Sequence, residues 1–321
     1  MPVWFNESDV RALLPMPDLI ESTARAVTAF SGGLVTQPVR TVFAIPGGFL
    51  AAMPACIAAG ETALGAKLVT VCHHNAGHGL PSHLATILLM DPATGAMLAV
   101  MDGRYITEAR TAAASAVAVR LLAREDACTL AILGSGVQAR SHLQALSLVR
   151  HFTDIRVWSP TAANREKFAA ESAGRPVRAA ATAEEAARNA DVIVLATASD
   201  TPAVEIAWVK PGACIASVGA CRPNQREMDP DLVARARLYV DSRAAALTES
   251  GDIIQGIREG RFGESHIVAE LGELVSNSAL GRTSPDQVTV FKSVGIAVED
   301  VAAAALVYRR AIASGKGQPL G

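Results

Sequence analysis

The sequence is poor in aromatic residues and carries almost no net charge. Only 4% of its 321 residues are aromatic, and 29 basic against 31 acidic side chains leave a formal charge of −2. Few aromatics argue against a protein that stacks nucleic-acid bases, and a neutral chain lacks the basic field that attracts nucleic acids or anionic membranes. No uncharged apolar run reaches the ~20 residues of a membrane-spanning helix. We therefore expect no nucleic acid and no membrane as partner.

The cysteines form no recognisable framework. There are five of them, widely spaced and without a C-x-x-C pair, which argues against a disulfide scaffold and a zinc knuckle. We expect buried thiols in a reducing compartment. The N-terminal residues lack the basic and apolar regions of a signal peptide, so a cytoplasmic protein is expected. The cysteines are Cys56, Cys72, Cys128, Cys214 and Cys221.

Half of the residues are hydrophobic, which excludes disorder, and 321 residues at ~100–200 per domain suggest two domains. In the first third, an amphipathic pattern from Pro17 to Phe30 predicts a helix that ends at Gly32-Gly33. Turn residues between apolar runs predict hairpins. This part should form an antiparallel or mixed sheet with helices. Its expected strands are Val39–Ile45, Phe49–Met53, Leu68–Cys72, Ala85–Met90 and Met97–Asp102.

The pattern becomes regular after a helix that Thr107 is expected to cap and that runs to Leu122. Strands then alternate with helices, one of them opened by a Thr182/Glu185 capping box, which predicts a doubly wound parallel sheet. The strands that complete this predicted series are Thr129–Leu133, Ile155–Trp158, a short one near Val177, Val192–Ala196, Cys214–Val218 and Leu238–Val240.

A last alanine-rich helix, Gly295–Ala313, resembles the helix that precedes the parallel sheet. The predicted fold class is therefore α/β, with a doubly wound parallel sheet of the Rossmann type inserted into a discontinuous α+β domain. Residues 1–115 and 294–321 should form the discontinuous domain, and residues 116–293 the NAD(P)-binding domain.

A strand runs directly into G-x-G-x-x-A, spelled Gly134-Ser135-Gly136-Val137-Gln138-Ala139. Gly134 permits a tight turn, Gly136 lets a pyrophosphate approach the backbone, and Ala139 lets helix and strand pack closely. The N–H groups of the helix start would hold the phosphates. A glycine turn without a ligand is the alternative.

The next strand ends without the acidic residue that usually binds the ribose of NAD. The segment reads Trp158-Ser159-Pro160-Thr161, with Arg165 shortly after it. A 2′-phosphate would meet no repulsive charge and could be bound by Ser159, Thr161 or Arg165. NADPH is therefore favoured and NADH is possible. In the alternative interpretation these residues only start the next helix, and either cofactor is used.

Three cations lie in apolar surroundings: Arg40, Lys67 and Arg110. Such charges are rarely buried unless paired, and arginine suits bidentate binding of a carboxylate. Each alone could be a solvated edge residue, but together they suggest an anionic substrate. His73, His74 and His78 suggest a metal site, yet neighbouring strand positions face opposite ways, so a polar loop and no metal are predicted.

Several motifs in order resemble the ornithine cyclodeaminase/mu-crystallin family. They are Lys67-Leu68-Val69-Thr70, Met101-Asp102-Gly103, Arg110-Thr111-Ala112-Ala113, the Gly134 turn, Val218-Gly219-Ala220-Cys221-Arg222-Pro223, Glu249-Ser250-Gly251-Asp252, Ala269-Glu270-Leu271-Gly272-Glu273, Val290-Phe291-Lys292-Ser293 and Val298-Glu299-Asp300. The resemblance implies a homodimer that acts on a small amino or imino acid with a nicotinamide cofactor. It also implies that the discontinuous domain serves substrate binding and dimerisation and that the inserted Rossmann domain binds NAD(P).

The resemblance also implies roles for individual residues. Arg40, Lys67 and Arg110 would bind the substrate carboxylate, Arg110 would also lie close to the cofactor, and Glu249 would lie near the substrate. Lys67, Arg110 and Glu249 are the candidate catalytic residues, with Lys67 or Glu249 as a proton donor. The residues implied to line the cofactor are Ser82, His83, Gly134, Ser135, Gly136, Val137, Gln138, Thr197, Val218, Gly219 and Ser293.

One departure separates the subfamilies. Ornithine cyclodeaminases and related alanine dehydrogenases carry an Asp about two residues after the glycine that follows the fifth strand, whereas here no carboxylate stands between Gly219 and Glu227. This segment is similar to the mu-crystallin pattern. The predicted enzyme is an NAD(P)H-dependent ketimine reductase that converts Δ1-pyrroline-2-carboxylate or Δ1-piperideine-2-carboxylate to L-proline or L-pipecolate. The alternatives are ornithine cyclodeaminase, alanine dehydrogenase and a non-catalytic, crystallin-like binding protein.

Overall fold

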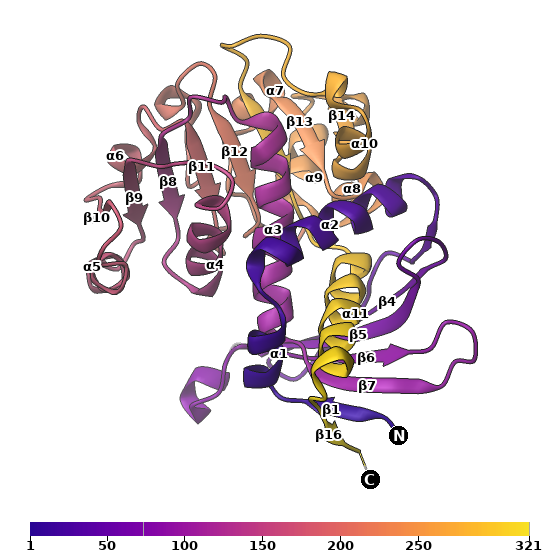
Figure 1. Ribbon diagram of the computed structural model, residues 1–321. Helices are drawn as coiled ribbons and strands as arrows, with labels where there is room; N and C mark the ends of the chain where they lie inside the picture. Colours follow the sequence, from indigo (N-terminus) through magenta and orange to yellow (C-terminus); the bar gives the residue numbers. More distant parts are fainter. Residues whose placement is uncertain (73, 321) are drawn as a thin grey trace. The chain divides into compact units, whose positions relative to one another are not determined.

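A computed structural model describes residues 1–72 and 74–320 (Figure 1). His73, which the sequence assigns to a polar loop, lies outside these residues. The chain divides into two compact units. Unit 1 comprises Met1–Arg110 and Gly295–Gly321, and unit 2 comprises Thr111–Val294. Within the described parts of the chain, no helix has the length and apolar character needed to cross a membrane.

Unit 1 is built on a mixed sheet, as predicted. Strands β1 and β7 pair in parallel, and every other neighbouring pair that the structure describes in this sheet is antiparallel. The strand order is β16-β1-β7-β6-β5-β4-β2, and β3 pairs with β4. The strands are β1 (Val3–Phe5), β2 (Val35–Thr36), β3 (Thr41–Ile45), β4 (Gly48–Ile57), β5 (Ala63–Cys72), β6 (His83–Met90), β7 (Met97–Asp102) and β16 (Gln318–Pro319).

One face of this sheet is covered by helix α11 (Ala297–Ser314), which contacts β4, β5, β6 and helix α2 (Met16–Ser31) (Figure 1). Side chains alternate across β5, so that Gly65, Lys67 and Val69 are buried while Ala66 and Leu68 are not. The missing side chain of Gly65 allows close packing, because a Cβ there would lie 3.3 Å from Val301 of α11. Unit 1 also contains α1 (Glu7–Leu13), the 3₁₀ turn η1 (Asn75–His78) and the start of α3 (Arg104–Leu122).

Unit 2 contains the predicted doubly wound parallel sheet. All of its described strand pairs are parallel, and the order is β10-β9-β8-β11-β12-β15-β13-β14. Its central strands are buried on both faces, as expected where helices cover a parallel sheet. The strands are β8 (Thr129–Leu133), β9 (Asp154–Trp158), β10 (Val177–Ala179), β11 (Val192–Leu195), β12 (Cys214–Ser217), β13 (Arg237–Val240), β14 (Ile267–Glu270) and β15 (Thr289–Lys292).

The connections of unit 2 are mostly short helices. They are α4 (Val137–Leu146), α5 (Ala162–Glu171), α6 (Ala183–Ala187), α7 (Pro230–Arg235), α8 (Arg243–Glu249), α9 (Gly251–Arg258) and α10 (Leu271–Ser276), with 3₁₀ turns at Ile206–Trp208, Glu264–His266 and Ser278–Leu280. The Rossmann-type fold predicted from the alternation of strands and helices is thereby confirmed.

Some local predictions were wrong. Strands β14 and β15 were missed, although β15 lies in the sheet between β12 and β13. Helix α3 begins at Arg104, whose N–H donates to the Asp102 carboxylate over 2.9 Å, so Thr107 does not cap it. Instead the Thr107 hydroxyl donates to the Gly103 carbonyl within the first turn.

The Thr182 hydroxyl does accept a bond from the Glu185 N–H. However, the Glu185 carboxylate accepts from Ala181 rather than from Thr182, so the capping box is incomplete.

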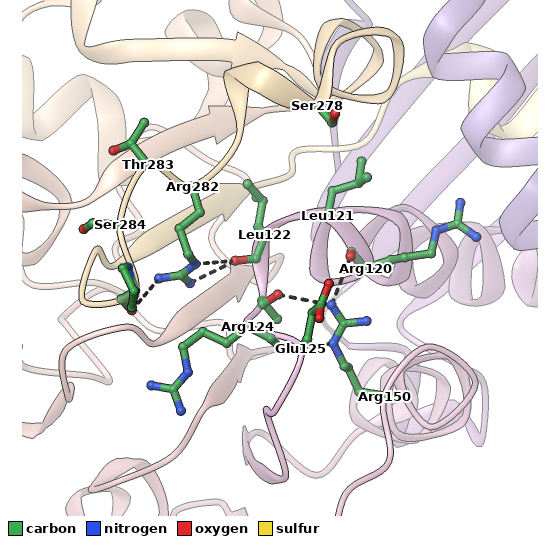
Figure 2. A pocket seen from close by; sticks show the side chains of 12 residues that line it. Arg120, Leu121, Leu122, Arg124, Glu125, Arg150, Ser278, Arg282, Thr283 and Ser284 are labelled. Atoms are coloured by element: carbon green, nitrogen blue, oxygen red, sulfur yellow. Dashed lines mark hydrogen bonds between the residues drawn. The ribbon is translucent and has the colours of Figure 1, made fainter.

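The C-terminal end of α3 borders a cavity of about 560 Å³ in unit 2 that is lined by four arginines (Figure 2). Arg150 donates to the carbonyls of Arg120, Ala123 and Arg124, and Arg282 donates twice to that of Leu122. Carbonyl groups at a helix end lack intrahelical partners and carry partial negative charge. Both guanidinium groups therefore act as caps of α3, and their N–H groups are largely committed to that end.

Candidate active site

The turn after β8 has a conformation that only glycine adopts readily. Gly134 has φ +129°, and a Cβ there would lie 2.4 Å from the Ala196 carbonyl oxygen. Its N–H donates to the Trp158 carbonyl over 2.8 Å. The turn is thus packed between the ends of β9 and β11, which brings the predicted Gly134 position to the carboxyl edge of the parallel sheet.

The next glycine of this turn, Gly136, has free space around its Cα, whereas Gly134 is closely packed. Gly136 is the N-cap of α4 and has no side chain to cap the helix, and a Cβ built there meets no atom of the described residues within 4 Å. The Gln138 side-chain oxygen is buried and finds no hydrogen-bond partner within residues 1–72 and 74–320. Open space and N–H groups without a side-chain cap fit the phosphates of a dinucleotide, whereas the Gln138 oxygen is an acceptor and could bond only to a donor group of a ligand.

The residues predicted to read the ribose lie together at the end of β9. The Arg165 guanidinium donates to the Ser159 carbonyl over 2.9 Å, and the Ser159 hydroxyl donates to the carbonyl of Thr161, the N-cap of α5. No Asp or Glu occurs between Trp158 and Arg165 in the sequence. The end of this strand therefore presents a cation and hydroxyl groups but no carboxylate.

The loops after β11 and β12 are tied together by Glu227. One carboxylate oxygen accepts from the N–H and hydroxyl of Thr197 over 2.7 and 2.8 Å, and the other accepts from the N–H of Gly219 over 2.8 Å and of Ala220 over 3.1 Å. Gly219 leaves no room for a side chain, since a Cβ would lie 1.8 Å from the Thr197 carbonyl oxygen. Glu227 thus fixes the predicted positions Thr197 and Gly219.

A buried lysine that the sequence did not single out lies beside Glu227. Lys292 Nζ lies 3.1 Å from the Asp252 carboxylate, 3.8 Å from that of Glu227 and 3.0 Å from the Ser217 hydroxyl. Burial alone would lower the pKa of Lys292, but the two carboxylates raise it above its usual value. We call Ser217, Glu227, Asp252 and Lys292 the Lys292 cluster. Next in the chain, the Ser293 hydroxyl donates to Asp241 over 2.9 Å.

Unit 1 holds a second buried cluster, which contains the three cations singled out in the sequence. Lys67 Nζ donates to Asp300 over 2.6 Å, and Arg110 donates to Asp300 over 3.1 Å and to Glu299 over 2.7 Å. Lys67, Arg110, Glu299 and Asp300 are almost completely buried. The half-buried Arg40 donates to the Gly295 carbonyl over 2.8 Å. These five residues form the Lys67 cluster.

The electrostatics of this cluster leave Lys67 able to change charge near neutral pH. Burial lowers the pKa of Lys67 to about 8, with Asp300 opposing the shift and Arg110 adding to it. Burial opposes ionisation of Asp300, yet Arg110 and Lys67 hold its pKa below the usual value. His83 on β6 has a pKa of about 4, lowered by burial and then by the charges of Lys67 and Arg110. It is therefore neutral at pH 7.

The charge balance corrects the sequence analysis, which expected three cations in an otherwise apolar domain. Two buried carboxylates, Glu299 and Asp300, lie against them. Three cationic and two anionic side chains leave the Lys67 cluster with one net positive charge. Such a cluster matches a ligand with a single carboxylate.

The remaining candidates divide between the units. Ser82 precedes β6 in unit 1, where its carbonyl accepts from the Cys72 N–H over 2.8 Å. Glu249 is the last residue of α8 in unit 2. The sequence did not indicate that Glu227, Asp252 and Lys292 are partners. The available signal was that Asp252 and Lys292 are charged residues within motifs of the family resemblance. The pairing of Glu299 and Asp300 with Arg110 joins positions about 190 residues apart.

A parallel sheet with a glycine turn after its first strand, inserted into a unit with buried cations, defines the class of Rossmann-type oxidoreductases. The chain is 46% identical over 297 residues to the ketimine reductase mu-crystallin of Mus musculus, covering 92% of this chain and 91% of the relative.

Two solved structures have the same fold. One is Δ1-pyrroline-2-carboxylate reductase of Thermococcus litoralis in complex with NADH and L-proline, with TM-score 0.95, 39% identity and coverage of 99% of this chain and 100% of that one. The other is an archaeal alanine dehydrogenase dimer with bound NAD, with TM-score 0.94, 30% identity and coverage of 100% and 99%. The profile of the ornithine cyclodeaminase/mu-crystallin family matches residues 3–315, so the chain belongs to this family.

Proposed function

We propose that this protein is an NAD(P)H-dependent ketimine reductase that reduces Δ1-pyrroline-2-carboxylate or Δ1-piperideine-2-carboxylate to L-proline or L-pipecolate. The observation that carries the proposal is the Lys67 cluster, which combines a net charge suited to one carboxylate with a lysine that titrates near pH 8. The related ketimine reductase and the reductase structure with NADH and L-proline support the same chemistry.

The substrate carboxylate is bound by Arg40, Lys67 and Arg110. Charge-assisted hydrogen bonds from such groups are stronger than neutral ones, and two guanidinium groups can donate hydrogen bonds to both carboxylate oxygens. Fixing the carboxylate fixes the neighbouring imine carbon, and ideal positioning of this kind contributes ~7–11 kcal/mol to lowering a barrier. Specificity for one carboxylate follows, because Glu299 and Asp300 already neutralise two of the three cations.

The cofactor is held by the Gly134 turn and the start of α4. A nicotinamide cofactor supplies the hydride when bound. We expect Thr197, Val218, Gly219 and Ser293 of unit 2 to line it, and the family resemblance implies a cofactor role for Ser82, His83 and Arg110 as well. NADPH is favoured because Ser159, Thr161 and Arg165 offer hydroxyl groups and a cation, without a carboxylate, to a 2′-phosphate.

Lys67 is the proton donor in this proposal. Its ammonium group is charged below pH 8 and can pass a proton to the imine nitrogen, then regain one from water. Glu249 is the second candidate, supported by the family resemblance. If Lys67 is the donor, the side chain that gives the proton is one of those that bind the substrate carboxylate, and no further acid is needed.

A homodimer is part of the proposal. The face of β5 opposite α11 carries Leu64, Ala66 and Leu68, which remain partly or fully exposed, and such an apolar face is typical of a protein interface. The related archaeal alanine dehydrogenase is a dimer. Light scattering of the protein tests this, with Leu68→Lys expected to shift the mass toward the monomer and exposed Leu148→Lys in unit 2 as the matched control.

The activity is tested by following nicotinamide absorbance while the pure protein meets each candidate substrate. Oxidation of NADPH or NADH with Δ1-pyrroline-2-carboxylate or Δ1-piperideine-2-carboxylate, but not with pyruvate and ammonia, is expected. Release of ammonia from L-ornithine in the presence of NAD⁺ would indicate the cyclodeaminase instead. Absence of turnover with both cyclic imines would contradict the proposal.

A further inference from the structure

Asp300 lies between the two main cations of the Lys67 cluster and divides its carboxylate between them. Its Oδ2 accepts from Lys67 Nζ over 2.6 Å, and its Oδ1 accepts from Arg110 Nε over 3.1 Å. Its side chain is completely buried. Both oxygens are therefore engaged with protein cations, which makes Asp300 a poor candidate for direct contact with an anionic substrate.

The fold places Asp300 there through the contact of α11 with β5. Asp300 lies in the first turn of α11, next to Val301, whose side chain packs where Gly65 of β5 has none. Lys67 lies two residues after Gly65 and points to the same face of the sheet. The backbone geometry of two elements thus sets the Lys67–Asp300 distance.

We propose that Asp300 is a positioning residue that keeps the Lys67 ammonium charged and aimed at the imine nitrogen during ketimine reduction. This inference rests on the proposed function. In the step it serves, a hydride from the nicotinamide forms the new C–H bond at the imine carbon. The C=N π pair moves to nitrogen, which takes a proton from Lys67 Nζ, while the reduced nicotinamide becomes oxidised. Water returns a proton to Lys67.

The groups that face Lys67 explain why one carboxylate decides its charge. From α3, Arg110 disfavours the ammonium, and Arg40 does the same from the loop before β3. His83 of β6 is neutral above pH 4. Glu299 bonds to Arg110 and is not in hydrogen-bond contact with Lys67. Among the described residues, Asp300 is the carboxylate bonded to Lys67, so its loss leaves a buried ammonium beside two guanidinium groups.

The first arm of the test measures the Lys67 charge without any substrate. The chain has five lysines, Lys67, Lys167, Lys210, Lys292 and Lys316, so ¹³Cε-lysine labelling yields few NMR signals, and Lys67→Arg identifies that of Lys67. We expect the Lys67 signal to titrate near pH 8 in the wild type and about one to three pH units lower in Asp300→Asn. The adjacent variant Glu299→Gln is the matched control, since it removes an equal buried charge without removing a bond to Lys67, and it should lower the Lys67 titration by less than Asp300→Asn does.

The second arm measures kinetics in both directions. Imine reduction needs charged Lys67 and should decline above pH 8, whereas L-proline oxidation needs neutral Lys67 and should rise through the same pH. In Asp300→Asn both limbs should move to lower pH together, and Asp300→Glu should restore them in part. A merely structural role would lower thermal stability and kcat without moving the limbs.

The two arms separate the failure of this inference from that of the proposed function. An unchanged Lys67 titration in Asp300→Asn overturns the role of Asp300, whatever the protein reduces. If Asp300→Asn does not fold, the Lys67 titration is measured in Asp300→Glu instead. A Lys67 midpoint displaced from that of the wild type supports the role of Asp300, because the longer side chain changes the contact, and an unchanged midpoint overturns it. A wild-type protein without turnover of cyclic imines overturns the proposed function alone.

Discussion

Each unit contains a buried lysine that lies beside carboxylates, and the pKa values of these two lysines are shifted in opposite directions. Lys67 has one bonded carboxylate, Asp300, which it shares with Arg110, and burial lowers its pKa to about 8. Lys292 has Asp252 at 3.1 Å and Glu227 at 3.8 Å, and these raise its pKa above the usual value despite burial. Burial is complete for both, so it does not explain the difference.

The difference lies in how the neighbouring charges are divided. In the Lys67 cluster cations outnumber carboxylates, whereas in the Lys292 cluster two carboxylates face one ammonium. A buried charge that is fully compensated stays charged and serves structure, and one that is undercompensated titrates near neutral pH and can transfer a proton. The two lysines of this chain thus differ in their carboxylate partners rather than in their exposure.

The largest effect should come from Lys67→Met, which keeps length and apolar stem but removes the ammonium. The loss of a proton donor typically lowers rates ~10²–10⁴-fold, and kcat/KM for Δ1-pyrroline-2-carboxylate should fall in that range. Stability should change less, because Asp300 keeps its bond to Arg110. Steady-state kinetics and thermal denaturation measure both, and exposed Lys316→Met is the control. Activity within threefold of the wild type would contradict the role of Lys67.

Lys292→Met should reverse this pattern and affect stability first. It leaves Glu227 and Asp252 buried without their cation, and breaking a buried ion pair in this way costs ~3–5 kcal/mol. Denaturant unfolding should show that loss of unfolding free energy. Because Glu227 also holds Thr197 and Gly219, the KM for the cofactor should rise as well. A fully stable variant would break the comparison between the two lysines.

The two glycines of the turn after β8 allow a similar comparison between a residue that affects stability and one that affects cofactor binding, with smaller expected changes. Gly134→Ala should destabilise unit 2 by ~1–3 kcal/mol or more, since φ is +129° and Ala196 leaves no room. Gly136→Ala should keep stability and raise the cofactor KM about tenfold, ~1.4 kcal/mol, because its Cβ would occupy the open space. Denaturation and cofactor titration separate them, and equal stability losses in both would be the contrary result.

The smallest effect concerns the choice of cofactor. Arg165→Ala removes the cation at the end of β9 and should raise the KM for NADPH about five- to tenfold, with little change for NADH. Arg178→Ala on β10 is a control at an exposed arginine. A wild-type preference for NADH, or equal effects on both cofactors, would show that Arg165 does not read the 2′-phosphate.

The parallel sheet and its glycine turn could be predicted from the sequence because their signals are local. Gly134, Gly136 and the apolar run before them lie within a few residues of one another, and strand–helix alternation specifies the topology. Strands β14 and β15 were missed because each ends in a charged residue, Glu270 in β14 and Lys292 in β15. A lysine inside a strand contradicts the expected apolar pattern unless distant carboxylates compensate it.

Of the candidate site, the cations could be predicted from the sequence but their carboxylate partners could not, because the partners are distant in the chain. Arg40, Lys67 and Arg110 stand out as charges in apolar segments, but their partners lie in an alanine-rich helix far along the chain. Lys67 and Asp300 are 233 residues apart, so nothing local connects them. Glu299 and Asp300 also occupy the first turn of α11, where acidic residues are ordinary features of a helix start.

The most direct test of this account is a pH titration of the wild-type protein in which the ¹³Cε signals of Lys67 and Lys292 are followed in the same spectra. We expect a midpoint near pH 8 for Lys67, while Lys292 should remain charged beyond the pH at which ordinary lysines titrate. Identical titrations of the two lysines, or a Lys67 midpoint at its ordinary value of 10.5, would contradict it.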